Sequence, residues 1–235
     1  MKRAVVCLGV GKNWFPEGVA RLGASVKEHS PDIDFCGITS WPLGCPTHNE
    51  VPWGFKPWAV QDAIEAGYES ILWLDSSIWA CRPLEPLFEY IEDTGSMFVR
   101  DAYTTGQWCT DAALPTLGTT REELLTVPHI WAASIGLCVH DERAVEFQRE
   151  WLRLSRDGIT FHGSGTNDKG QVSSDPRVKG HRHDQTAASF LAWKLGMEMI
   201  PWHHPENGFI VAESVDPGPP VCLLARGGIK GVHWD

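Results

Sequence analysis

Three charged side chains that could do chemistry stand beside predicted strands and helices. Asp75 follows the apolar run 71–74, Lys56 opens one predicted helix, and Asp184 opens another. A carboxylate at the end of a buried strand lies where open α/β sheets bind their ligands. Its oxygens suit hard cations such as Mg²⁺ and Mn²⁺. Taken alone, however, an aspartate in this position more often caps the turn that follows it.

The surrounding pattern indicates the elements that must position these side chains. The run 71–74 has no polar alternation, which is typical of a strand buried on both faces of a parallel sheet. Pro57 and Gly67 stand in the first turn and just past the end of the helix that Lys56 opens. We expect strands at 4–10, 34–39, 70–75, 96–100, 130–139 and 197–201, and helices at 16–30, 56–66, 83–93, 121–126, 141–155 and 186–195.

The order of these elements predicts the fold class. Strands and helices alternate in the early part of the chain, whereas 160–182 and most of 101–128 are expected to be irregular. Within the second of these segments, Thr119 and Glu122 match a capping box for a helix. Alternation of this kind is typical of a parallel sheet covered by helices. We therefore expect a single domain, 1–235, of the α/β class, with a mostly parallel, Rossmann-like central sheet flanked by helices.

Composition excludes several classes of protein. The 235 residues are 43% hydrophobic and 21% charged, which is typical of a globular domain. The net charge of −10 does not favour non-specific binding to nucleic acid or to membrane surfaces. The seven cysteines include no CxxC pair, which favours reduced thiols and a cytoplasmic location. No apolar stretch approaches the length of a membrane span.

Four short motifs occur in an order that resembles one group of enzymes. Segment 72–77, LWLDSS, looks like a hydrophobic strand leading into a DxD motif, and 55–58, FKPW, opens the helix before it. The motifs HDQ at 183–185 and GVHW at 231–234 follow later in the chain. Together they resemble the nucleotide-sugar-dependent glycosyltransferases of the GT-A fold. The last two are similar to motifs of the retaining, glycogenin-like branch, family 8.

This resemblance implies an activity and its substrates. The expected reaction transfers a sugar from a nucleotide-diphosphate sugar to a hydroxyl group, with retention of configuration. The acceptor would be a saccharide or a small molecule, with a modified nucleic acid possible but not favoured. Breaking the sugar–diphosphate bond builds negative charge that a divalent cation can neutralise. The resemblance implies Mn²⁺ or Mg²⁺, held by Asp75, Ser77 and His233, although Ser77 stands where a second carboxylate is the family's pattern.

The resemblance to this family also implies roles for the other site residues. Asp184 would stabilise the positive charge that develops on the sugar, and Gln185 would hydrogen-bond the sugar or the donor. The residues assigned to donor binding follow strands or flank the motifs; they are Gly9, Val10, Gly11, Asn13, Lys56, Asp75, Ser76, Asp101, Ser134 and Lys230. Several have plain structural alternatives. Asp184 could N-cap its helix, Lys56 could be a solvated lysine, Asp101 a loop carboxylate and Ser134 a packing residue.

Three other functions can be compared with the sequence. A sugar-nucleotide pyrophosphorylase needs a Gly-rich, Arg-containing loop after its first strand, and segment 8–13, LGVGKN, does not match it. An aspartyl-phosphate phosphatase carries its DxD after the first strand, whereas here the motif follows the third. A non-catalytic module of the same fold that binds nucleotide sugars or carbohydrate is the main alternative, because Ser77 weakens the expected metal site.

Overall fold

The structure is a computed structural model that describes residues 1–11, 14–201, 210–212 and 223–225. A central six-stranded sheet has the order β2-β1-β3-β6-β5-β7. Its strands are β1 (Arg3–Leu8), β2 (Asp34–Ile38), β3 (Ser70–Leu74), β5 (Ser96–Thr104), β6 (Pro128–Cys138) and β7 (Ile200–Pro201). Only β6 runs against the other strands of this sheet. The α/β class and the mostly parallel sheet expected from the sequence are therefore confirmed.

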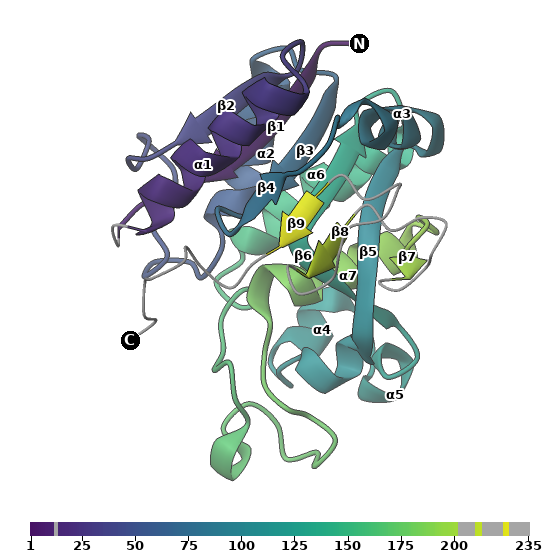
Figure 1. Ribbon diagram of the computed structural model, residues 1–235. Coiled ribbons are helices and arrows are strands. Elements are labelled where there is room, and N and C mark those ends of the chain that lie inside the picture. Colours follow the sequence, from purple (N-terminus) through teal and green to yellow (C-terminus); the bar gives the residue numbers. More distant parts are fainter. Residues whose placement is uncertain (12–13, 202–209, 213–222, 226–235) are drawn as a thin grey trace.

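Helices cover both faces of this sheet, as Figure 1 shows. Helices α1 and α3 pack on one face, and α2, α6 and α7 pack on the other. The helices are α1 (Trp14–His29), α2 (Phe55–Glu65), α3 (Glu85–Thr94), α4 (Ala113–Leu117), α5 (Arg121–Leu124), α6 (Glu142–Ser155) and α7 (His183–Lys194), with 3-10 turns η1 (Thr105–Trp108) and η2 (Asp168–Gly170). No helix in the described ranges is long and apolar enough to cross a membrane.

A small second sheet, with the order β4-β9-β8, lies in front of the central sheet in Figure 1. It consists of β4 (Ile78–Ala80), β8 (Ile210–Ala212) and β9 (Leu223–Ala225). Strand β4 pairs antiparallel with β9, and β8 pairs parallel with β9. Strand β4 therefore extends the chain beyond the turn at Asp75, which the sequence pattern did not predict.

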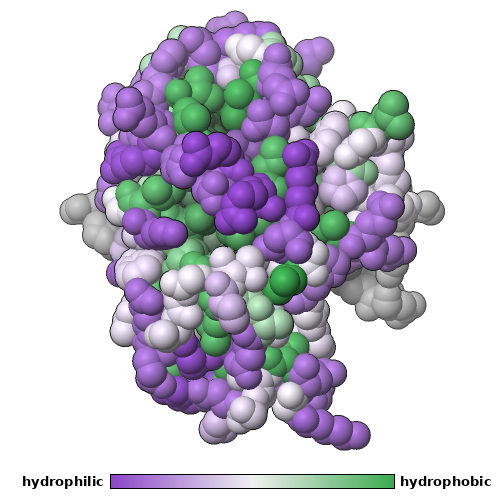
Figure 2. Space-filling model, turned by 180° about the vertical axis from the view of Figure 1, so that it is seen from behind, coloured by the Kyte–Doolittle hydropathy of each residue, from purple (hydrophilic) through white to green (hydrophobic). Residues whose placement is uncertain are grey.

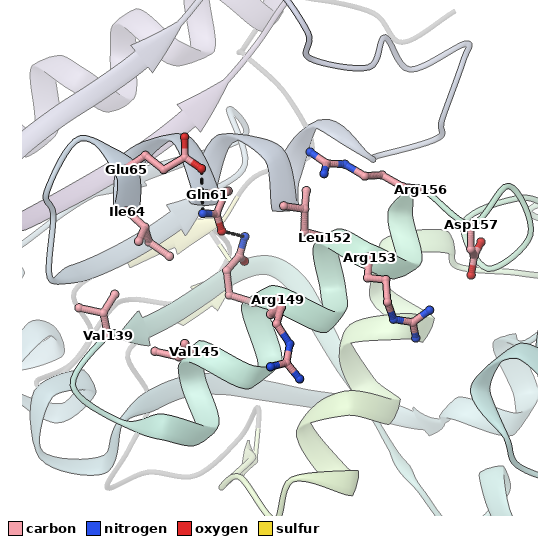
Figure 3. A pocket seen from close by; sticks show the side chains of 11 residues that line it. Gln61, Ile64, Glu65, Val139, Val145, Arg149, Leu152, Arg153, Arg156 and Asp157 are labelled. Carbon is pink, nitrogen blue, oxygen red and sulfur yellow. Dashed lines mark hydrogen bonds between the residues drawn. The ribbon is translucent and has the colours of Figure 1, made fainter.

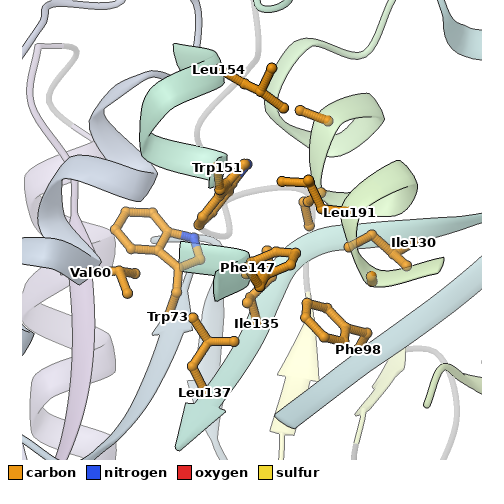
Figure 4. Close-up of a cluster of buried hydrophobic side chains, with 14 of the residues drawn as sticks. Val60, Trp73, Phe98, Ile130, Ile135, Leu137, Phe147, Trp151, Leu154 and Leu191 are labelled. Atoms are coloured by element: carbon orange, nitrogen blue, oxygen red, sulfur yellow. The ribbon is translucent and has the colours of Figure 1, made fainter. Parts of the chain in front are cut away.

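Strand β3 divides its side chains between two hydrophobic clusters. Ile71 and Trp73 point to the cluster formed with α2, α6 and α7, whereas Leu72 and Leu74 point to the cluster formed with α1 and α3. All four side chains are fully buried, because successive residues of a strand alternate between the faces of the sheet. Figure 4 shows Trp73 among Val60, Phe147, Trp151 and other members of the first cluster. The predicted strand with two buried faces is confirmed.

Segment 101–128 is more regular than the sequence predicted. Strand β5 continues to Thr104 because it pairs with the long strand β6, and irregularities in register bend it along the way. Helix α4, which begins at Ala113, was not predicted. The predicted capping box at Thr119 is wrong by one residue: the N-cap of α5 is Thr120, whose hydroxyl accepts from the backbone N–H of Glu123. In contrast, Asp141 caps α6 as a helix N-terminus favours.

Candidate active site

Two adjoining cavities lie at the carboxyl ends of β1 and β3. The larger one, the aromatic cavity, has a volume of about 610 Å³ and is bordered by both strand ends. Its lining residues are Leu8, Gly9, Val10, Gly11, Trp14, Phe15, Trp41, His48, Asn49, Trp53, Phe55, Asp75, Ser76 and Ser77. Helix α1 begins at its wall with Trp14, so the positive end of that helix dipole faces the cavity. Aromatic rings and a helix N-terminus together suit a flat ring system that carries an anionic group.

The smaller one, the polar cavity, has a volume of about 150 Å³. It is lined by Trp53, Lys56, Asp75, Trp131, Ala133, Arg182, His183, Asp184 and Gln185. Trp53 and Asp75 border both cavities, so the two meet at the end of β3. The carboxylate of Asp75 therefore lies between the aromatic cavity and the polar cavity.

Lys56, on the first turn of α2, joins the two carboxylates of the polar cavity. Its Nζ lies 3.0 Å from Oδ1 of Asp75 and 3.1 Å from Oδ2 of Asp184, and it donates to the carbonyl of Ala132 at 2.9 Å. The side chain is only 3% exposed. An ammonium group has three protons, and here three oxygens surround it. Lys56 is thus not a solvated lysine, and it is arranged to hold both carboxylates in place.

The direction of β6 makes this arrangement possible. Because β6 runs antiparallel to β3, its first half lies beside the end of β3, and the backbone N–H of Asp75 donates to Ala133 at 2.9 Å. The carboxylate of Asp75 accepts from the indole Nε1 of Trp73 at 2.9 Å, again at Oδ1. Asp75 is therefore fixed by its neighbours in the sheet and by Lys56, and its carboxylate does not cap the following turn.

Asp184 is a buried carboxylate at the start of α7, and it is 4% exposed. Burial raises its pKa to about 6; Lys56 lowers the value, and Asp75 raises it. The N-cap of α7 is Arg182, so the alternative role of Asp184 as N-cap is wrong. Because Asp184 lies in the first helical turn, the helix dipole also favours its ionised form. Close to pH 6 this carboxyl group can change its charge while it faces the cavity.

The orientation of Gln185 is fixed by hydrogen bonds on its amide nitrogen. Nε2 donates to the carbonyl of Ile130 at 2.5 Å and to Oδ2 of Asp101 at 3.3 Å. The same oxygen of Asp101 lies 2.8 Å from Nδ1 of the buried His129. Gln185 lines the polar cavity, whereas Asp101 supports it from behind and is not among the lining residues.

Two strained residues stack where the cavities meet. Trp53 and His183 have φ values of 56° and 45°, in the left-handed region that residues with a Cβ rarely occupy. Their rings are stacked with centroids 4.8 Å apart. Nδ1 of His183 lies 2.9 Å from the carbonyl of Phe161, and burial lowers the pKa of this imidazole. Such strain persists only where the surroundings enforce it, and it occurs often at functional sites.

A close backbone approach holds the end of β3 against α1. A Cβ added at Gly18 would lie 2.2 Å from the carbonyl oxygen of Ser76, a distance that real atoms do not reach. Only glycine allows α1 to pack this closely. The position of Ser76 and Ser77 in the wall of the aromatic cavity therefore depends on a residue of α1.

The structure brings together most of the residues predicted from the sequence. Gly9, Val10, Gly11, Ser76 and Ser77 line the aromatic cavity, and Asp184 and Gln185 line the polar one. Ser134 is buried on β6 and lines neither cavity; Ala133 takes the position beside Asp75. Asn13, Lys230 and His233 lie outside the described residues.

The sequence reasoning missed other members of the site. Trp53, Arg182 and His183 were not assigned, although each lines the polar cavity. His183 and Arg182 directly precede the assigned Asp184, so proximity in the chain was an available signal. Trp53 lies in a loop rich in Pro, Gly and Trp, where no spacing rule applies.

The described residues do not by themselves complete the expected metal site. Asp75 directs Oδ1 to Lys56 and Trp73, and Ser77 adds only a neutral hydroxyl. No group of three or more His, Cys, Asp or Glu side chains that could hold a metal ion occurs within the described ranges. Mg²⁺ requires about six oxygen ligands, and an adjacent ammonium repels a dication. The positive charge that the described residues place at this position belongs to Lys56.

A larger hollow of about 820 Å³ lies between α2 and α6, behind the sheet. Figure 3 shows Ile64, Val145 and Leu152 facing it, with Arg149 and Arg153 around them. Figure 2 views the molecule from behind, where apolar patches alternate with hydrophilic side chains. This hollow shares no lining residue with either cavity and contains no paired carboxylates facing a cation, so we place the site at the strand ends.

Comparison with known proteins supports the fold. No protein-family model and no curated protein matches the chain. Among solved structures, the chain is similar to a glycosyltransferase involved in the glycosylation of the major capsid of PBCV-1. The TM-score is 0.54 at 13% sequence identity, and the match covers 94% of this chain and 93% of the other. At this identity the likeness establishes a shared fold over nearly the whole length of both chains.

Proposed function

We propose that the protein is a GT-A type glycosyltransferase that transfers a sugar from a nucleotide-diphosphate sugar to a hydroxyl acceptor. The observation that carries this proposal is the pair of cavities that meet at Asp75. A nucleotide sugar has an aromatic base, an anionic diphosphate and a polyhydroxylated ring in that order. The aromatic cavity suits the base, Ser76, Ser77 and the N-terminus of α1 beside the end of β3 suit the diphosphate, and the polar cavity suits the ring, in the same order. The shared fold with a glycosyltransferase adds support.

In this proposal each part of the donor has its own environment. The base and ribose lie among Trp14, Trp41 and Phe55, above the backbone of Gly9–Gly11. The diphosphate lies at Ser76 and Ser77, near the N-terminus of α1, which favours anions. The sugar occupies the polar cavity, where Gln185 can present its amide oxygen, because its nitrogen is already engaged.

The chemistry is carried by charge in the polar cavity. As the bond between the sugar and the diphosphate breaks, positive charge develops on the sugar and negative charge on the leaving group. The ionised carboxylate of Asp184 stabilises the first, and Arg182, in the same cavity, stabilises the second. Lys56 lines the same cavity and keeps Asp184 ionised and fixed, because its Nζ is ion-paired with Asp75 and Asp184 and donates to the carbonyl of Ala132.

A divalent cation remains a proposal that derives from the resemblance. Asp75 and Ser77 would be two of its ligands and His233 the third. When bound, the cation would neutralise the leaving diphosphate. The described residues supply too few ligands for a cation, so the proposed mechanism does not depend on one. The positive charge in the polar cavity comes from Lys56 and Arg182.

The proposal is tested by screening nucleotide-diphosphate sugars in a thermal-shift assay, with and without Mn²⁺, followed by assay of nucleoside diphosphate release. We expect one class of donor to raise the melting temperature and to be hydrolysed slowly in the absence of acceptor. Asp184→Asn should bind that donor but release product at only a low residual rate. Stabilisation without release in the wild-type protein would favour the binding module, and no stabilisation by any donor would contradict both functions.

A further inference from the structure

A continuous band of contacts runs outward from the polar cavity and returns to it. Nε2 of Gln185 donates to Asp101, whose Oδ1 accepts from the backbone N–H of Tyr103 at 2.8 Å. The Tyr103 ring meets the Trp108 ring edge-on, with centroids 5.5 Å apart. The guanidinium of Arg182 lies 3.9 Å from the centre of the Trp108 ring. Because Arg182 and Gln185 both line the polar cavity, these five residues form a band of contacts that begins and ends at the cavity, and we call this band the rim.

Backbone hydrogen bonds make this rim a fixed structure. The N–H of Arg182 donates to the carbonyl of Trp108 at 3.2 Å, and the N–H of Lys179 donates to the carbonyl of Gln107 at 2.8 Å. The end of the loop between α6 and α7 is thus tied to η1, at the end of the molecule where α4 and α5 lie in Figure 1. Tyr103 and Arg182 therefore keep their positions relative to the cavity.

The rim combines aromatic surface with positive charge that no carboxylate of the described residues neutralises. Tyr103 is 43% exposed, although it is a large aromatic residue. Neither Arg182 nor Lys179 forms an ion pair with any described residue, whereas the nearby Arg177 is paired with Asp175 and Glu122. The Nζ of Lys179 lies 5.7 Å from the centre of the Tyr103 ring. In a chain with net charge −10, two unpaired cations beside an exposed ring are a distinct surface.

Trp108 adds an unmet hydrogen-bond donor. Its indole Nε1 is buried and has no hydrogen-bond partner among the described residues. A buried N–H without a partner costs on the order of 1–3 kcal/mol, so a ligand oxygen that reached it would be bound favourably. Unmet donors, cations and aromatic faces are together the groups that recognise a carbohydrate, because hydroxyl oxygens accept hydrogen bonds and sugar C–H faces pack on rings.

We infer that this rim is the acceptor subsite and that it binds a saccharide. This inference rests on the proposed function, since the sugar to be transferred would occupy the polar cavity next to it. The acceptor ring packs against Tyr103, and its oxygens face Arg182 and Lys179. One of its hydroxyl groups then lies at the mouth of the polar cavity, close to the reacting carbon of the donor.

The subsite is tested with Tyr103→Ala, Tyr103→Phe and the matched control Trp193→Ala. Trp193 is also a surface aromatic, 37% exposed, but it lies at the far end of α7. Two rates are measured with the donor found in the thermal-shift screen: hydrolysis without acceptor, and transfer to a panel of methyl pyranosides. We expect Tyr103→Ala to raise the acceptor KM about tenfold, which corresponds to about 1.4 kcal/mol, and to leave donor hydrolysis unchanged. Tyr103→Phe and the control should behave as wild type.

Each failure has a distinct signature. An unchanged acceptor KM in Tyr103→Ala, or an equal loss of hydrolysis and transfer, would overturn the subsite. Absence of donor hydrolysis and transfer in the wild-type protein would instead contradict the proposed function. In that case saturation-transfer NMR with the same methyl pyranosides tests the subsite without turnover. Signals that weaken in Tyr103→Ala but not in Trp193→Ala support the subsite, whereas equal signals, or none in the wild-type protein, refute it.

Discussion

Replacing Lys56 by methionine removes the one cation that lies between the two carboxylates of the polar cavity. Methionine has nearly the same length and fills the same buried space, but it donates no hydrogen bond. Three oxygens would lose their partner: Oδ1 of Asp75, Oδ2 of Asp184 and the carbonyl of Ala132. Asp75 keeps the indole of Trp73, whereas Asp184 would remain buried without an opposite charge.

The expected magnitude follows from these contacts. Removing one partner of a buried ion pair costs about 3–5 kcal/mol, because the other charge stays buried and uncompensated. For a chain of this size each kcal/mol lowers the melting temperature by roughly 2–4 °C, so a decrease on the order of 10 °C is expected. The control Lys27→Met changes an exposed lysine of α1 and should alter stability by less than about 0.5 kcal/mol.

The loss should also depend on pH in a defined direction. In the folded protein the pKa of Asp184 is raised to about 6, above its value in the unfolded chain. The stability that comes from its easier protonation is therefore fully present below the unfolded pKa, and it is lost as pH rises through about 6. Without Lys56 that pKa rises further, and the loss extends to higher pH. Urea unfolding of both variants at about pH 5 and about pH 8 should therefore show a deficit in Lys56→Met that grows with pH. A deficit below about 1 kcal/mol at both values, or one that shrinks with rising pH, would refute the role assigned to Lys56.

Three further outcomes are expected. The rate of donor hydrolysis should decrease below about pH 6 because Asp184 must be ionised. The low residual rate of Asp184→Asn should not decrease in this range. If it does, the pH dependence belongs to another group. Gly18→Ala should lower the free energy of unfolding by about 1–3 kcal/mol and weaken nucleotide binding in calorimetry, because the new Cβ would displace Ser76; unchanged binding would mean that the end of β3 is not part of the donor site. His233→Ala should reduce the tightening of nucleoside diphosphate binding by Mn²⁺ at least tenfold, whereas the exposed control His140→Ala should not; equal titrations in both variants would remove His233 from the metal proposal.

The sequence was sufficient where short-range patterns determine structure. The apolar run before Asp75 predicted a strand with two buried faces, and Pro57 with Gly67 bounded the helix that carries Lys56. The same patterns could not predict which charged groups meet. The ammonium group of Lys56 also reaches the carbonyl of Ala132, because β6 runs antiparallel to β3 and brings this residue near the end of β3. The direction of β6 cannot be predicted from the local sequence around Asp75, because β6 lies roughly 60 residues further along the chain.

The site residues that lie in loops or in segments expected to be irregular were also not predicted from the sequence. Trp53 borders both cavities, yet it belongs to a segment without helical or strand periodicity, and its left-handed backbone is not readable from its residue type. Tyr103 and Trp108 were missed because the segment that contains them was expected to be irregular. Their positions follow from the pairing of β5 with β6 and from the loop that closes on η1.

The stacked pair of Trp53 and His183 has a consequence for anyone who engineers this protein. Among the described residues, three that carry a Cβ have positive φ, and these are two of them. Glycine adopts that backbone without strain, but at either position it would remove one of the stacked rings, and at position 183 it would also remove a buried imidazole and its contact with the carbonyl of Phe161. Relief of backbone strain in such variants would therefore be offset by lost packing, and at position 53 the two cavities would also lose a wall that they share. Libraries intended to stabilise the protein should therefore leave positions 53 and 183 unchanged and sample the surface of α6 instead.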